Sequence, residues 1–183
     1  MKNLILSAAL LLATTTAFAQ KTDTTKTQST KSTQTANDQD RMFVMKALEG
    51  GNAEIKKGAL ARSKSKNPEI VKYGDMMEND HHSVNNKLKQ AAEQKGYKVS
   101  DQLTAEAQKM HSTLDKMEGE AFDREFVRQM ISDHRQAIEL FKQQATNGTD
   151  QELKNLAAGA LPTLETHLKE IERLHGNMTN KTR

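Results

Sequence analysis

The 183-residue chain has no cysteine, which excludes disulfides, thiolate catalysis and zinc sites built on cysteine sulfur. It also has no tryptophan, only two prolines and nine glycines, and 4% aromatic residues. Sheet proteins favour aromatic and β-branched residues and need frequent turns, so these absences favour an all-helical fold. The length is typical of one domain. Any chemistry must therefore use carboxylates, imidazoles, thioethers or hydroxyls.

The charge is nearly balanced, with 27 basic and 24 acidic side chains and a formal net charge of +3. These charges are mixed along the chain, and no basic block is interleaved with aromatic residues. We therefore expect no nucleic-acid partner. What the chain does have is nine methionines and six histidines, and these supply the candidate ligands.

Residues 1–19 have the pattern of a signal peptide. Lys2 gives a positive start, residues 4–12 form an apolar run, and Ala17-Phe18-Ala19 forms a small-x-small cleavage site. The apolar run is too short to span ~30 Å of hydrocarbon. We expect export to the periplasm or an outer-membrane-associated location, with no transmembrane span after the signal is removed.

Residues 20–37 form a tract of Thr, Lys, Gln and Ser without large apolar side chains. Such a tract cannot bury enough apolar surface to offset the entropy of ordering, which predicts a disordered tether. Its composition identifies no partner, so an envelope component and self-association both stay open.

The remaining chain has the apolar period of long helices and clear helix boundaries. Asn67-Pro68 is a helix start, and Lys95-Gly96 is a helix end. Thr149 and Glu152 have the spacing of a capping box. The domain is predicted at 38–176, with a flexible C-terminus at 177–183, and its helices are predicted at 38–63, 68–95, 119–146 and 150–176.

The first two helices and the last two are joined by short connections, which predicts two antiparallel hairpins. Between the hairpins, residues 96–118 form a longer crossover with a helical pattern after Ser100. This arrangement is typical of a ferritin-like four-helix bundle with a long, partly helical crossover. A simple up-down bundle with a decorated loop is the alternative.

Three of the six histidines, His81, His134 and His167, lie within the apolar stripes of three different helices. The other three lie off the stripes and are expected at the surface: His82, His111 and His175. A histidine in an apolar stripe is often a neutral, hydrogen-bonded core residue. Three together favour a polar cluster or a metal site as strongly as they favour that structural role.

Two glutamates add carboxylates to this set. Glu78 precedes His81 by three residues, the Glu-x-x-His spacing with which one helix presents a carboxylate and an imidazole to a metal, and Glu54 flanks the stripe of the first helix. The candidate metal ligands are Glu54, Glu78, His81, His134 and His167. No catalytic residue and no organic cofactor is predicted.

The motif Met-x-x-Asp-His occurs twice, at 77–81 and 130–134. Its aspartates, Asp80 and Asp133, are candidate hydrogen-bond acceptors for the histidine ligands, or surface ion pairs. Its methionines, Met77 and Met130, offer a softer ligand set. Thioether with imidazole suits copper, whereas carboxylate with imidazole suits iron, manganese or zinc.

Three motifs together resemble the exported bacterial domain-of-unknown-function family 4142. The resemblance covers residues 38–176 and implies a ferritin-like fold and a periplasmic or outer-membrane location, with no settled activity. The second Glu-x-x-His of a ferritin di-iron site is missing. Residues 130–138 also look like a second exported helical family rich in Met and His. The motifs of the main resemblance are residues 73–81, 122–134 and 161–168.

Three functions stay open on this basis. The first is an exported helical bundle that binds a metal ion in its core. The second is a non-catalytic envelope interaction or structural protein whose core histidines are purely structural. The third is a metal-dependent oxidoreductase, which is the only enzyme class the residues suggest.

Overall fold

The computed structural model describes residues 24–181 and the side chains of residues 37–180. The predicted signal peptide and the first residues of the predicted tether lie outside this range. Within the range the chain forms helices and no strands, which confirms the all-α prediction. The helices are α1 (Thr24–Lys64), α2 (Pro68–Gln94), α3 (Ala105–Asp115), α4 (Gly119–Asn147) and α5 (Gln151–Lys181).

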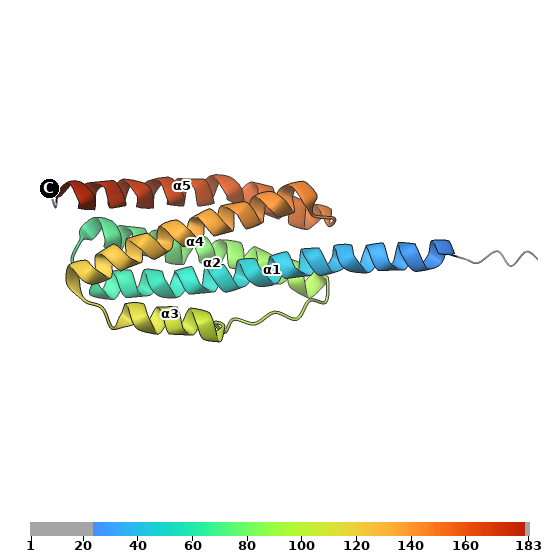
Figure 1. Cartoon of the computed structure of the whole chain (residues 1–183), viewed down its shortest axis with the longest axis horizontal. Coiled ribbons are helices and arrows are strands. Elements are labelled where there is room, and N and C mark those ends of the chain that lie inside the picture. Colours follow the sequence, from blue (N-terminus) through green and yellow to red (C-terminus); the bar gives the residue numbers. More distant parts are fainter. Residues whose placement is uncertain (1–23, 182–183) are drawn as a thin grey trace, which may run out of the picture.

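The first and last helices are longer than the sequence predicts. α1 begins at Thr24 instead of near residue 38, and its first part projects beyond the bundle (Figure 1). α5 continues to Lys181, so it includes most of the segment predicted as a flexible C-terminus. None of the described helices has an apolar stretch that could cross a membrane.

The boundaries of α2 follow from local chemistry that the sequence predicts. The side chain of Asn67 accepts a hydrogen bond from the amide of Glu69, and Pro68 occupies the first helical position. At the other end Gly96 has φ 69°, a left-handed conformation that favours glycine, and the amide of Tyr97 bonds back to the carbonyl of Ala92.

The predicted capping box at the start of α5 is wrong. Asp150 caps the helix instead, because its Oδ1 accepts a hydrogen bond from the amide of Leu153. The hydroxyl of Thr149 donates to the carboxylate of Asp40 on α1, which also accepts from Gln144 and from the backbone. Burial would raise the pKa of Asp40, but these hydrogen bonds outweigh it and lower the pKa. This buried carboxylate therefore ties α1 to the α4–α5 turn.

The four long helices form a bundle in which α1 packs against α2 and α4, and α5 packs against the same two helices. The end of α1 lies beside the start of α4, where Lys64 pairs with Glu118 at 2.8 Å. The end of α2 lies beside the start of α5, where Lys95 pairs with Glu152 at 3.0 Å. Each helix is therefore antiparallel to both of its neighbours.

The connection from α2 to α4 runs the length of the bundle, and α3 lies along the outside of it (Figure 1). This long connection makes α2 and α4 parallel, whereas a short turn would make them antiparallel. The ferritin-like arrangement with a partly helical crossover is thus confirmed, and the simple up-down bundle is excluded.

The interior consists of two apolar clusters, one toward each end of the bundle. The first apolar cluster lies toward the α4–α5 turn, and its larger members include Phe43, Leu88, Phe141 and Leu164. The second apolar cluster lies toward the α1–α2 turn, and its larger members include Tyr73, Met77, Phe122, Phe126 and Met130. Between the two clusters, each long helix contributes at least one buried polar residue.

Candidate metal centre

The polar layer between the clusters is made of Glu54 from α1, His81 from α2, His134 from α4 and His167 from α5. Their exposed fractions are only 2%, 5%, 0% and 1%, in that order. Each lies on the buried face of its helix, and the register between the helices brings the four side chains to one level. The α1–α2 hairpin and the α4–α5 hairpin each contribute two of them.

The three histidines converge. One ring nitrogen from each of them lies within 4.8 Å of the others. The closest approach is between Nε2 of His134 and Nδ1 of His167, which are 3.3 Å apart. The same three residues have ring centroids 5.3–5.8 Å apart. Sequence spacing alone predicts that each faces the interior, and the structure adds that they meet at one point.

The outer nitrogens of two histidines face oxygen atoms that fix their tautomers. Nδ1 of His134 lies 2.9 Å from the carbonyl oxygen of Met130, which can only accept. Nε2 of His167 lies 2.9 Å from Oδ2 of Asp80, which accepts when it is ionised. Each of these nitrogens therefore carries a proton when the ring is neutral, and the lone pairs of His134 and His167 face each other.

His167 is neutral at pH 7. Burial lowers its pKa, the neighbouring His134 and His81 lower it further, and the hydrogen bond to Asp80 compensates only in part. The resulting pKa is about 4. When both rings are neutral in these tautomers, no proton lies between Nε2 of His134 and Nδ1 of His167, and the pair of nitrogens is then free to bind a cation.

Glu54 connects the remaining histidine to the layer. Its Oε2 lies 2.9 Å from Nε2 of His81, and its Oε1 lies 3.4 Å from Nδ1 of His134. Burial alone would raise the pKa of Glu54, but the two histidines outweigh it and the pKa falls to about 2. Burial disfavours the charged form of His81, yet the Glu54 carboxylate outweighs burial and raises its pKa.

The Glu54–His81 pair is close without being hydrogen-bonded. Although 2.9 Å fits an ion pair, the two groups are not aligned for a hydrogen bond. Nε2 of His81 and Oε1 of Glu54 consequently have no hydrogen-bond partner among the described residues. Buried polar atoms without partners are rare in folded proteins and often mark a binding site for an ion or water.

Tyr73 supports the layer from the second apolar cluster. Its hydroxyl donates to the backbone carbonyl of His167 at 3.3 Å, and its ring lies edge-on to His134 with centroids 6.3 Å apart. Burial and the nearby carboxylates raise the pKa of Tyr73. The residue therefore stays a neutral donor that holds α2 against α5.

Glu78 is not part of the layer. Its Oε2 lies 3.0 Å from Nη1 of Arg62, on the side of α2 that faces α1, while its Oε1 is buried without a hydrogen bond. The Glu-x-x-His spacing therefore does not bring both groups to one point here, because the arginine of the neighbouring helix holds the carboxylate.

The two aspartates of the repeated motif have different partners. Asp80 accepts from His167, as described above, whereas Oδ2 of Asp133 lies 2.6 Å from Nζ of Lys57. Burial raises the pKa of Asp133, with Lys57 opposing it. Lys57 is 3% exposed, and it is not among the site residues that the sequence predicts. Its position three residues after Glu54, on the same face of α1, is the signal that could have found it.

The candidate soft ligands Met77 and Met130 are fully buried in the second apolar cluster. Each lies one helical turn before a histidine, so the structure places them beside the polar layer. Of the histidines predicted at the surface, His82 and His175 are exposed and His111 is partly buried.

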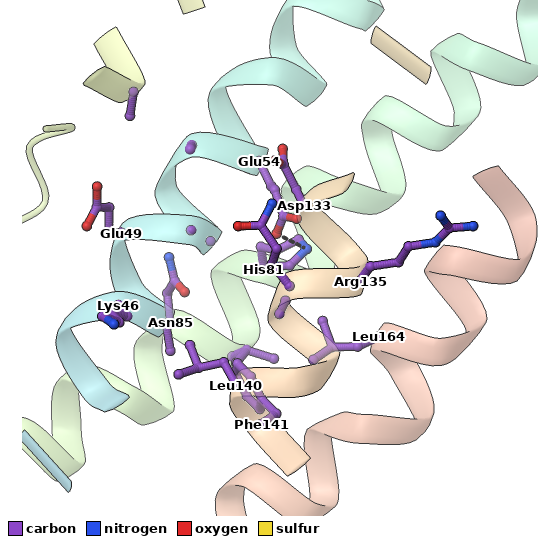
Figure 2. Close-up of a pocket in the computed structure, with 18 of the residues that line it drawn as sticks. Lys46, Glu49, Glu54, His81, Asn85, Asp133, Arg135, Leu140, Phe141 and Leu164 are labelled. Atoms are coloured by element: carbon purple, nitrogen blue, oxygen red, sulfur yellow. Dashed lines mark ion pairs between the residues drawn. The ribbon is translucent and has the colours of Figure 1, made fainter. Parts of the chain in front are cut away.

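A cleft of about 850 Å³ reaches the polar layer from the surface. It lies between α1 and α4 and is flanked by α3, and both Glu54 and His81 line it. Figure 2 shows these two side chains pointing toward each other between the helices, with Asp133 beside them and Arg135 pointing away. A smaller cleft of about 270 Å³ between α2 and α5 is lined by Asp80.

Solved structures of the same fold include two types of protein. A DUF305 fragment from Deinococcus radiodurans has a TM-score of 0.67 and 16% identity, covering 76% of this chain and 96% of its own. CopM in the Cu(I)-bound form has a TM-score of 0.64 and 20% identity, with the same coverage. CopM in the Cu(II)-bound form has a TM-score of 0.64 and 21% identity, covering 76% and 97%.

No curated protein matches the chain. A family model does match, over residues 25–174, and this range includes all of the polar layer and most of every helix. The chain therefore belongs to the DUF4142 family, a domain of unknown function.

Proposed function

We propose that this protein is an exported helical bundle that binds one transition-metal ion through His81, His134 and His167. The observation that carries the proposal is the 3.3 Å distance between Nε2 of His134 and Nδ1 of His167, two inner ring nitrogens that face each other. A tetrahedral ion with metal–nitrogen bonds of ~2.0–2.1 Å requires nitrogens about 3.3–3.4 Å apart. The pair is therefore already spaced for such an ion.

The surroundings of the histidines support the same assignment. In metal sites the outer nitrogen of a histidine ligand usually donates to a carboxylate or a carbonyl, which fixes the ring and raises its basicity. Here Asp80 does so for His167 and the carbonyl of Met130 for His134. Glu54 supplies the negative charge beside His81, whose nitrogen lies within 4.8 Å of the other two.

The ligand chemistry selects among metals. Three imidazoles suit zinc, copper, iron or nickel. A di-iron or manganese centre requires more carboxylates, and Glu78 is held by Arg62 instead. CopM, which shares this fold, has been solved with copper bound. We therefore place copper and zinc first.

Metal analysis of protein purified without a histidine tag tests the proposal. We expect about one Cu²⁺ or Zn²⁺ per chain after loading and dialysis. The variants His134→Gln and His167→Gln should each bind at least about tenfold more weakly, the loss typical of removing a group on which a metal site depends.

The matched control is His82→Gln, because His82 follows His81 directly on α2 but is exposed. This variant should bind like the wild type. No stoichiometric metal in the wild type, or equal binding by His134→Gln and the wild type, would contradict the proposal and favour the structural role of the histidines.

A further inference from the structure

We infer that the cleft between α1 and α4 is the route by which the metal ion enters and leaves the polar layer. This inference rests on the proposed metal site. The first support is position: Glu54 and His81 belong both to the layer and to the wall of this cleft, so an ion in the cleft meets them before it meets His134 or His167.

The second support is the chemistry at the inner end of the cleft. Among its lining residues, Glu54 Oε1 and Asn85 Oδ1 are buried acceptors without a hydrogen bond. Nε2 of His81 also has no hydrogen bond, although it lies 2.9 Å from Oε2 of Glu54 as an ion pair. The residues themselves are 2%, 2% and 5% exposed, respectively. Oxygen acceptors and an imidazole are groups that can replace the water ligands of an incoming cation one at a time.

The third support is the small size of the residues that border this path. Gly50, Gly51 and Ala53 on α1 face Ala137 on α4 across the cleft. A methyl group at Gly51 would lie 2.4 Å from Oδ1 of Asn85, whereas one at Gly50 would meet nothing within 4 Å. Gly51 therefore packs closely against Asn85, and larger side chains among these small lining residues would fill the path.

The α2–α5 side offers a poorer route. Its cleft is smaller and ends at Asp80, whose carboxylate accepts a hydrogen bond from Nε2 of His167. An ion from this side would have to break that bond and pass the protonated nitrogen. On the α1–α4 side the cleft ends at Glu54 and His81 themselves, which are 2.9 Å apart as an ion pair without an aligned hydrogen bond at Nε2 of His81.

Two substitutions block the proposed route without touching a ligand: Ala53→Leu and Ala137→Leu. Ser83→Leu adds the same side chain in the α2–α5 cleft, and Ala158→Leu adds it on an exposed face of α5. Circular dichroism and thermal unfolding check that each variant is folded. The probe is Zn²⁺ alone, with release followed by transfer to a chromophoric chelator and uptake by stopped flow.

We expect Ala53→Leu and Ala137→Leu to slow both uptake and release by about tenfold, because filling the path raises a barrier common to both directions. Kd should change by less than about twofold, since a barrier alone leaves the equilibrium unchanged. Ser83→Leu and Ala158→Leu should exchange zinc at the wild-type rate.

Unchanged rates in both blocking variants, or slow exchange in Ser83→Leu alone, would overturn the route while leaving the metal site intact. A wild-type protein that binds no Zn²⁺ in the same experiment would overturn the proposed function as well. The two failures are therefore distinguishable from one set of measurements.

Discussion

The polar layer and the second apolar cluster are buried to the same degree, but they are stabilised differently. Phe126 in the cluster and His134 in the layer both have 0% exposure. Phe126 packs against Tyr73 and Phe122 with ring centroids 6.1 and 5.9 Å away, and it has no polar atom to satisfy. In His134, by contrast, Nδ1 lies 2.9 Å from the carbonyl oxygen of Met130, and Nε2 lies 3.3 Å from Nδ1 of His167.

In the proposed function, the cluster provides stability and the layer provides metal binding. Dispersion and apolar burial are complete in the cluster without a ligand. The layer retains buried atoms without a hydrogen bond on His81 and Glu54, and the proposed metal ion would contact this layer. A substitution in the cluster should therefore lower the free energy of unfolding equally with and without metal. A substitution in the layer should reduce the stabilisation that metal provides.

The largest expected effect is on the apolar cluster. Phe126→Ala removes a fully buried ring, and we expect the free energy of unfolding to fall by about 3–5 kcal/mol through lost burial and a residual cavity. Urea unfolding followed by circular dichroism measures it. The loss should be the same with and without Zn²⁺; a loss that zinc abolishes would show that the two regions are not independent.

Metal binding should have the next largest effect, and only through the layer. At free Zn²⁺ about 100 times the Kd, the wild type should gain about 2.7 kcal/mol of unfolding free energy. His134→Gln, with a Kd at least about tenfold higher, should gain at most about 1.4 kcal/mol under the same conditions, whereas Phe126→Ala should gain as much as the wild type. Thermal or urea unfolding with and without zinc measures these gains, and equal gains in all three proteins would count against the layer as the site.

Acid should weaken the metal-free layer through His167. Its pKa falls from 6.5 to about 4 on folding, so the unfolded chain binds the proton first. The stability from a neutral His167 is therefore complete above pH 6.5 and is lost as the pH falls toward 4. Relative to His167→Gln, the free energy of unfolding of the wild type should fall by about 2 kcal/mol over this pH range.

Urea unfolding at pH 7, 5.5 and 4.5 in the presence of a chelator measures this difference. The comparison between the two proteins cancels the titration of groups that do not interact with His167. Parallel pH profiles for the wild type and His167→Gln would show that His167 is not held neutral by burial.

The smallest effect should come from outside both regions. Arg135 pairs with Glu172 at 2.7 Å on the surface, with 64% and 43% of these side chains exposed. Exposed ion pairs contribute less than ~1 kcal/mol. We expect Arg135→Gln to leave both the unfolding free energy and the zinc-dependent gain within that limit, measured as above. A larger change would mean that the α4–α5 surface is coupled to the layer.

Much of the fold follows from local sequence. The start of α2 at Asn67-Pro68 and its end at Gly96 depend on residues adjacent in the chain, so the sequence predicts them. The cap of α5 does not, because Thr149 is taken by Asp40 from a distant part of the chain. Capping patterns are unreliable wherever a long-range partner competes for the capping side chain.

The candidate site shows the same limit. Helical spacing identifies His81, His134 and His167 as inward-facing, since each occupies a position of its own stripe. Spacing does not show at which level of the bundle each histidine lies. It also does not show that Glu78 pairs with Arg62 or that Lys57 pairs with Asp133. These outcomes depend on the register between helices, which a single sequence does not determine.

X-ray absorption spectroscopy of the metal-loaded protein tests the central claim most directly. The account predicts three nitrogen ligands at ~2.0–2.1 Å with the outer scattering of imidazole rings, and weaker imidazole scattering in His134→Gln. A sulfur shell at ~2.3 Å would instead indicate Met77 or Met130 as ligands. A purely oxygen shell, or an unchanged spectrum in His134→Gln, would contradict a metal centre built on the three histidines.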